Sequence, residues 1–304
     1  MSPAGAAPSG SDPHAGFEPV SLDTDGGRLA GLRLRTDASA GPHRPRLLCL
    51  HGWLDAATSF VPLARELDPD VELVALDLPG HGASAHAASG YGLLDMALAA
   101  RRAIAALGWE RCTVVGHSLG ANVALWLAVA DPEAVESLVL LDSAGPPAEA
   151  PQALPARLRR ALADRLDPSR FVPRTFLDLD AAIDHRLRYA RLSRASARLV
   201  VARQCEATAD GVRWRFDPAL RRANETYRTE AQVLAALGAV AAPALVAFAE
   251  SGFPIARAET PGRLAALAGA RRVTLPGHHH VHMDDPVPVA RAVREFLEVA
   301  SPSR

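Results

Sequence analysis

The chain has 304 residues, a formal net charge of −1 at pH 7 and 49% hydrophobic residues. This length suits one large α/β domain with an insertion better than two independent domains, and the apolar content allows a substantial core. The near-zero charge argues against the strongly basic surface that nucleic acids or anionic membrane surfaces attract. We therefore expect a small-molecule substrate and no nucleic-acid partner.

Cysteine usage and hydropathy indicate a cytoplasmic protein. Three cysteines lie far apart in the sequence, at Cys49, Cys112 and Cys205. Such a sparse, odd set favours a reducing compartment over a disulfide framework. No stretch approaches the roughly 20 continuous apolar residues of a membrane-spanning helix. Residues 1–16 lack the basic start and apolar run of a secretory signal, so we predict a disordered tail there. The sequence does not indicate an oligomeric state.

The first half of the chain alternates strands with helices. Residues 17–36 read as two antiparallel edge strands joined by a turn at residues 24–27. The expected elements that follow are a strand at 47–51, a helix at 59–67, a strand at 71–77, a helix at 91–107, a strand at 112–115, a helix at 119–130 and a strand at 138–142. This alternation predicts a mostly parallel sheet covered by helices on both faces.

Composition changes after Gly145, where the chain becomes rich in arginine and helical in pattern. We predict a helical cap or lid inserted at 146–241, which would close over the sheet edge and exclude water. The remaining residues, 17–145 and 242–304, form the predicted α/β core. The expected elements of its second part are a strand at 243–249, a helix near 261–268, a strand at 271–275 and a closing helix at 287–299. The cap pattern does not single out substrate-binding residues.

A tight strand–turn–helix stands at the centre of the chain. The segment VVGHSLG places Ser118 after a β-branched strand and before a helical pattern, with Gly116, His117 and Gly120 around it. Glycine on both sides removes the Cβ atoms that would clash in so sharp a turn. The arrangement is that of a nucleophile elbow, which presents a serine hydroxyl at the top of a sheet.

A serine nucleophile requires a base and an oxyanion hole. Four histidines in LPGHHHVHMDDP, at residues 275–286, follow a predicted strand and offer the base. A metal cluster on the alternating histidines is the alternative, but no carboxylate or cysteine constellation elsewhere supports it, so we expect no metal. The amide of Leu119 and one from the loop after RLLCLHGW fit the oxyanion hole. We expect His51 to brace that loop by hydrogen bonding.

With these pieces in order, the chain resembles the α/β-hydrolase superfamily. The matching pieces are HGW at 51–53, DLPGHGAS at 77–84, GHSLG at 116–120, LVLLDSAG at 138–145 and PGHHHVHMDDP at 276–286. More narrowly, HGWLDAATSF, GVRWRFDPALRR and the histidine-rich ending resemble the serine-hydrolase-like subgroup. The resemblance implies the α/β-hydrolase fold, a mostly parallel central sheet with helices on both faces and an inserted helical cap.

The resemblance also assigns roles to residues. It implies that Ser118 is the nucleophile. In the ending Gly-His-x-x-His-x-x-x-Pro, the first histidine is catalytic, and counting back from Pro286 makes that residue His279. His278 is the alternative, one residue away. The implied oxyanion amides are those of Trp53 and Leu119.

The acid of the triad departs from the family pattern. Members usually carry Gly-x-x-Asp after the penultimate core strand, but here Ala249 and Gly252 occupy those positions. Two candidates remain, Asp142 at the end of strand 138–142 and Glu250 in the usual loop. We favour Asp142 because it stands at the functional end of a strand, whereas Glu250 requires a shifted loop. A Ser–His dyad is a third possibility.

These residues predict a serine hydrolase of the esterase type that needs no cofactor. The expected reaction is hydrolysis of a carboxylic ester through an acyl-enzyme on Ser118. One alternative is the same triad acting on a C–C, thioester or lactone bond, or as a perhydrolase. The other is a weakly active or non-catalytic ligand-binding member of the fold, which the missing aspartate at position 252 keeps open.

Overall fold

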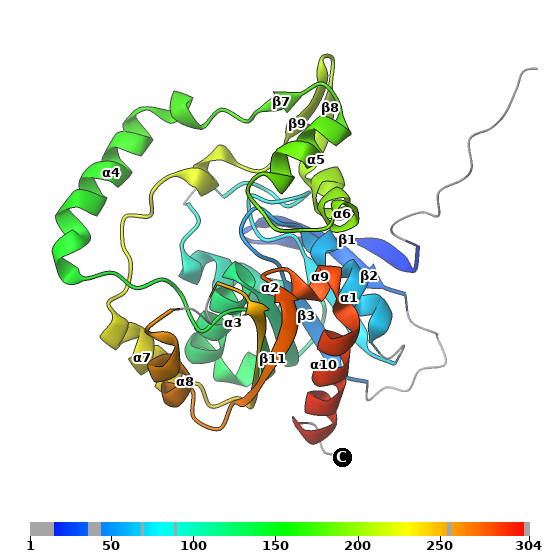
Figure 1. Cartoon of the computed structure of the whole chain (residues 1–304), viewed down its shortest axis with the longest axis vertical. Helices are drawn as coiled ribbons and strands as arrows, with labels where there is room; N and C mark the ends of the chain where they lie inside the picture. The colour runs from blue at the N-terminus through cyan, green and yellow to red at the C-terminus, as the bar shows by residue number, and fades with distance from the viewer. Residues whose placement is uncertain (1–14, 36–43, 68–69, 88–89, 254–256, 301–304) are drawn as a thin grey trace, which may run out of the picture.

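The computed structural model describes residues 15–35, 44–67, 70–87, 90–253 and 257–300 (Figure 1). The described residues form an eight-stranded sheet in the order β1-β2-β4-β3-β5-β6-β10-β11. Its strands are β1 (Phe17–Thr24), β2 (Gly27–Leu34), β3 (Arg46–Leu50), β4 (Glu72–Leu76), β5 (Cys112–His117), β6 (Val135–Leu141), β10 (Ala244–Ser251) and β11 (Arg271–His278). Strand β2 pairs antiparallel with β1 and β4, and the other neighbours are parallel. The predicted mostly parallel sheet with two antiparallel edge strands is confirmed.

Helices cover both faces of this sheet, as Figure 1 shows. Alternate residues of β3 belong to two separate cores, because side chains along a strand point to opposite faces. Leu48 and Leu50 pack in the core that includes residues of α2 (Leu93–Ala106) and α3 (Leu119–Ala130). Leu47 and Cys49 pack in the core that includes residues of α1 (Val61–Glu66) and α10 (Pro286–Ala300). The fold-class prediction of helices on both faces is therefore confirmed.

The core also contains two further short helices and two 3₁₀ turns among its described residues. They are α8 (Thr260–Ala266) and α9 (Val281–Asp284), with 3₁₀ turns η1 (Ala57–Phe60) and η2 (Pro132–Ala134). The helix predicted at 59–67 is thus split into η1 and α1. A proline in the first turn of α1 explains the break, because its fixed φ suits a helix start and its ring excludes a preceding helical turn.

Between β6 and β10 the chain forms the insertion, which we define as residues 146–241. Its helices are α4 (Leu154–Leu166), α5 (Leu179–Leu187), α6 (Arg194–Gln204) and α7 (Glu230–Gly238), with 3₁₀ turns η3 (Pro151–Ala153), η4 (Pro168–Phe171) and η5 (Pro218–Arg221). In Figure 1, α5 and α6 lie toward the top and α10 extends toward the bottom. The predicted limits of tail, core and cap stay a prediction.

The insertion also contains a small antiparallel sheet, which the helical prediction missed. Its order is β7-β9-β8, and its strands are β7 (Thr175–Phe176), β8 (Cys205–Thr208) and β9 (Gly211–Trp214). The strands are too short to show an alternating pattern. Gly211 has φ +131°, and a Cβ there would stand 2.6 Å from the carbonyl oxygen of Leu177, so glycine is required at this turn.

The predictions on tail, membrane and cysteines have different outcomes. Residues 1–14 of the predicted tail lie outside the described residues, while the Gly16 carbonyl accepts a hydrogen bond from the amide of Arg35. Among the described residues, no helix is both long and apolar enough to cross a membrane. All three cysteines are free and buried. Burial raises the pKa of the Cys112 thiol to about 12.

Candidate active site

Ser118 sits in a strained turn between β5 and α3. Its φ is 52° and its ψ is −109°, a left-handed conformation that a residue with a side chain rarely adopts. A Cβ on Gly120 would overlap the carbonyl oxygen of Leu50 on β3, and one on Gly116 would overlap the amide of Ala121. Both glycines are therefore required for the close approach of strand and helix. The turn leaves the serine half-buried at the start of α3, with its hydroxyl at the edge of a pocket.

Asp142 and His279 are brought together although 137 residues separate them. Asp142 directly follows β6, with φ 48°, and its Oδ2 lies 2.5 Å from His279 Nδ1. Its Oδ1 accepts from the amide of Ala249 at 3.0 Å, and its own amide donates to the carbonyl of Ala247 at 2.8 Å. Because a carboxylate only accepts, His279 Nδ1 carries the proton and Nε2 keeps a lone pair. That tautomer is the one a general base requires.

At position 252, which lacks the family aspartate, the space is filled by a carboxylate that follows a neighbouring strand. Gly252 follows β10, and a Cβ there would overlap Asp142 Oδ1 and stand 2.5 Å from Oδ2. The carboxylate of Asp142 thus fills the space that a side chain at residue 252 would need. Glu250, the alternative acid, is exposed at the end of β10. The structure therefore pairs His279 with Asp142 and leaves Glu250 at the surface.

The candidate catalytic residues line one small pocket of about 110 Å³. It is lined by Ser118, Asp142 and His279, together with Asn122, Ser143, Ala144, Gly145, Pro147, Phe253, Arg257, Thr260 and Arg263. The Phe253 ring lies 4.5 Å from the His279 ring, centre to centre. Sequence reasoning missed Asn122, Phe253 and the two arginines, because their positions depend on how distant loops meet.

The loop after β3 holds the predicted oxyanion residue Trp53. The amide of Asp55 donates to the Gly52 carbonyl at 3.0 Å, and Leu54 between them has φ 57°. His51 Nε2 accepts from the amide of Leu78 at 3.0 Å, so His51 braces the loop as expected. Burial lowers the pKa of His51, which keeps that nitrogen available as an acceptor. A loop fixed at both ends suits preorganised oxyanion donors.

The two predicted oxyanion residues stand at the ends of neighbouring strands. Trp53 follows β3 and Leu119 follows β5, and these strands pair in parallel. The Trp53 side chain is half exposed, and its Nε1 donates to the carbonyl of Leu220 in the insertion at 3.2 Å. This contact ties the loop after β3 to the insertion.

Next to His279 lies a buried group of three polar side chains, and the sequence did not indicate that these three meet. Atoms of Asp55, His117 and His280 lie within 4.8 Å of one another, the single group of metal-ligand residue types found in the described part of the chain. Of the alternating histidines weighed as metal ligands, this group contains His280 alone. The aspartate of HGWLD and the run of three histidines are visible in the sequence. Neither pattern predicts that these residues contact one another in the fold.

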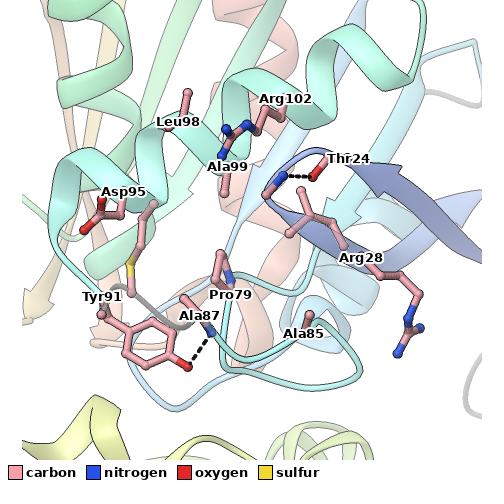
Figure 2. A pocket seen from close by; sticks show the side chains of 14 residues that line it. Thr24, Arg28, Pro79, Ala85, Ala87, Tyr91, Asp95, Leu98, Ala99 and Arg102 are labelled. Carbon is pink, nitrogen blue, oxygen red and sulfur yellow. Dashed lines mark hydrogen bonds between the residues drawn. The ribbon is translucent and has the colours of Figure 1, made fainter.

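A second pocket lies beside α2, as Figure 2 shows. Tyr91 and Arg102 are among its lining residues, and the Tyr91 hydroxyl accepts from the amide of Ala87 at 3.0 Å. That hydroxyl also donates to Asp217 at 2.5 Å, and Arg102 pairs with Asp25 at 2.6 Å. Its charged and polar groups thus serve structural contacts, so the Ser118 pocket is the better candidate.

Known proteins share this arrangement of elements. A profile of the α/β hydrolase fold family matches residues 45–286. The chain is 31% identical over 278 residues to a serine hydrolase-like protein of zebrafish, Danio rerio, which covers 87% of this chain and 85% of that protein. It is 34% identical to a hypothetical protein of Pseudomonas aeruginosa PAO1 of known crystal structure, with a TM-score of 0.85 over 92% of this chain and 99% of the other. A thioesterase domain from the curacin biosynthetic pathway is 25% identical, with a TM-score of 0.76 over 91% of this chain and 99% of that domain.

Proposed function

Because the chain belongs to the α/β-hydrolase family, in its serine-hydrolase-like subgroup, we propose that it is a serine esterase. Ser118 is the nucleophile, His279 the base and Asp142 the acid. The 2.5 Å contact between Asp142 Oδ2 and His279 Nδ1 carries the proposal, since it orients the imidazole toward the pocket that Ser118 shares. The strained backbone of Ser118 supports it, because such strain clusters at functional sites.

The reaction follows from the protonation states of these groups. His279 Nε2 takes the proton of the Ser118 hydroxyl as Oγ attacks the carbonyl carbon of the ester. The amides of Trp53 and Leu119 stabilise the resulting oxyanion. His279 returns the proton to the leaving alcohol as the tetrahedral intermediate collapses to an acyl-enzyme. A water molecule, activated by the same nitrogen, then attacks the acyl carbon and releases the acid and Ser118.

The size of the pocket supports esters with a short acyl group. A volume of about 110 Å³ holds a short acyl group, in a pocket that is partly open to solvent. Apolar contact comes from Ala144, Pro147 and Phe253. We therefore expect acetyl and butyryl esters to be hydrolysed faster than octanoyl esters.

Thioester hydrolysis is the second candidate, and one observation favours it. The curacin-pathway thioesterase domain is 25% identical with a TM-score of 0.76. The same acyl-enzyme would form, with a thiol leaving in place of an alcohol. No comparable observation favours C–C cleavage, lactone hydrolysis or peracid formation. The presence of Asp142 beside His279 weighs against a purely ligand-binding role.

The test is release of p-nitrophenol from acetyl, butyryl and octanoyl esters by the purified protein and by its Ser118→Ala variant. We expect turnover by the protein and none above background by the variant. Hydrolysis of short-chain acyl thioesters, measured by reaction of the released thiol with a thiol reagent, tests the second candidate on the same two proteins. Equal rates for protein and variant on every substrate would refute a serine mechanism.

A further inference from the structure

Asp55 lies where two loops of the candidate site meet the insertion. It belongs to the loop after β3, which carries Trp53. Its Oδ1 accepts from Arg186 Nη2 on α5 at 2.6 Å, and its Oδ2 is 3.3 Å from His280 Nε2. Its backbone carbonyl accepts from the side-chain amide of Gln204 on α6. The buried carboxylate thus contacts the loop of the base and α5, and the backbone carbonyl of the same residue contacts α6.

A second buried contact, close to Asp55, reaches the backbone of the base itself. His117, within the turn that carries Ser118, has its Nε2 at 2.8 Å from the backbone carbonyl of His279. Because a carbonyl oxygen only accepts, His117 Nε2 carries the proton and donates. Its other ring nitrogen, Nδ1, lies 3.7 Å from Asp55 Oδ2 without a hydrogen bond between them, so Asp55 and His117 hold the loop of the base at two separate points. The backbone carbonyl of His279 and the side chain of its neighbour His280 are therefore each held by a buried hydrogen-bond partner.

The charge of Asp55 is set by burial, by His280 and by Arg186. Burial raises the pKa of the Asp55 carboxyl, but His280 and Arg186 outweigh it and hold that pKa well below its usual value. Burial and the neighbouring histidines lower the pKa of His117, so it is neutral. Asp55 is therefore a charged carboxylate with 1% of its side chain exposed. Removing the partner of such a buried charge is strongly destabilising, because the charge is left uncompensated.

We propose that Asp55 is a positioning residue of the active site and that Arg186 of the insertion completes it. The inference rests on the proposed serine mechanism, since it assigns a role in orienting His279. Through Asp55, the loop of Trp53 and the loop of His279 keep one relative placement. Without Arg186, the carboxylate would turn toward other donors and release His280, and His279 would lose its alignment with Ser118.

A metal ion held by Asp55, His117 and His280 is the competing interpretation of the same atoms. It fits them less well, because both oxygens of Asp55 already have partners in Arg186 and His280. A divalent cation would also stand close to the Arg186 guanidinium in a buried space, where like charges repel strongly. The hydrogen-bonded network satisfies the carboxylate without an ion.

The chain offers a matched control for Arg186. Arg203 on α6 pairs with buried Asp77 at 2.7 Å, with side-chain exposures of 17% and 0% against 15% and 1% for Arg186 and Asp55. This pair also joins the insertion to the core. Asp77, however, accepts from the amides of Ala57 and Ala83 rather than from a histidine of the site. Breaking either pair removes the arginine partner of a buried aspartate. Arg203 makes more contacts, since it also donates from Nε to both Asp77 oxygens and from Nη2 to the carbonyl of Gly31, but only the Asp55 pair contacts the loop of His279.

The experiment compares Arg186→Gln with Arg203→Gln in the full chain. We measure kcat and KM for p-nitrophenyl butyrate, the melting temperature, and the low-field proton NMR signal of the His279 Nδ1–H. Both variants are expected to lose thermal stability, and Arg203→Gln at least as much as Arg186→Gln because Arg203 makes more hydrogen bonds. Arg186→Gln is expected to lower kcat about 10- to 100-fold with KM changed less than about three-fold, as misalignment predicts, and to shift the NMR signal. Arg186→Lys should restore most of kcat, whereas Arg203→Gln should keep kcat within about three-fold.

Two results would overturn the inference. One is an equal loss of kcat in Arg186→Gln and Arg203→Gln with the His279 NMR signal unchanged. In that case Asp55 stabilises the fold and does not position His279. The other is stoichiometric metal in the purified protein that Asp55→Asn removes. Failure of the proposed function is a separate result, namely a wild-type protein without esterase activity. In that case the NMR signal still decides whether Arg186 positions His279.

Discussion

Gly252 provides a direct test of where the acid of the triad lies. In Gly252→Ala, the added Cβ would overlap Asp142 Oδ1 and stand 2.5 Å from Oδ2, whereas real Cβ atoms stay beyond 3.0 Å of such neighbours. The carboxylate must therefore retreat by about 1 Å. It is held by the Ala249 amide at 3.0 Å and by His279 Nδ1 at 2.5 Å. A shift of that size breaks or lengthens both hydrogen bonds.

The expected loss of activity follows from this displacement. A misplacement of about 1 Å costs about 10²-fold in rate, and loss of the acid in a serine triad costs about 10⁴-fold. We therefore expect kcat of Gly252→Ala to fall between about 10²- and 10⁴-fold. The stability cost should resemble that of overpacking, about 1–3 kcal/mol. The protein should thus remain folded while activity is lost.

The assay is steady-state hydrolysis of p-nitrophenyl butyrate at 25 °C, with thermal unfolding measured on the same samples. Gly262→Ala is the matched control, because a Cβ at Gly262 on α8 would meet no atom within 4 Å. Its kcat should equal that of the wild type. A folded Gly252→Ala variant with kcat within about three-fold of the wild type would refute the placement of Asp142 as the acid.

Three further predictions concern individual side chains. Asp142→Asn should lower kcat about 10⁴-fold, because an amide can favour the wrong tautomer of His279. Glu250→Gln, a change at an exposed residue, should alter kcat less than about three-fold. Steady-state kinetics measures both. His279→Ala should remove nearly all hydrolysis and His278→Ala little of it; the reverse pattern would move the base by one residue. At pH 8, iodoacetamide should leave Cys112 unmodified until denaturant is added, as followed by intact mass, because burial raises its pKa to about 12 and leaves a thiolate fraction of ~10⁻⁴. Rapid labelling of native protein at Cys112 would contradict that burial.

Much of the fold could be predicted because local patterns agree with it. The edge strands β1 and β2, the buried strands and the turn at Ser118 each carry a short-range signal of periodicity or glycine spacing. The sheet of the insertion could not be predicted, since β7 has only two residues and β8 and β9 four each. Strands of that length form because Gly211 closes a hairpin and packing supplies the rest.

The site could be predicted only as far as single motifs reach. Ser118 and the histidine-rich loop follow from spacing, and Asp142 from its place at a strand end. From the sequence, Gly252 indicated only that the family aspartate is missing. No local signal shows that the Asp142 carboxylate fills the space that a side chain at residue 252 would need. The contact between Asp55 and Arg186 spans 131 residues and depends on how the insertion docks, which no motif encodes.

The central claim is that Ser118 is an activated nucleophile, and its most direct test is covalent labelling with a fluorophosphonate. The protein and its Ser118→Ala variant are each treated with the reagent, digested and mapped by mass spectrometry. We expect one phosphonyl group on the peptide that contains Ser118, and no label in the variant. Absence of label in the folded protein, or equal labelling of the variant at another residue, would contradict the account.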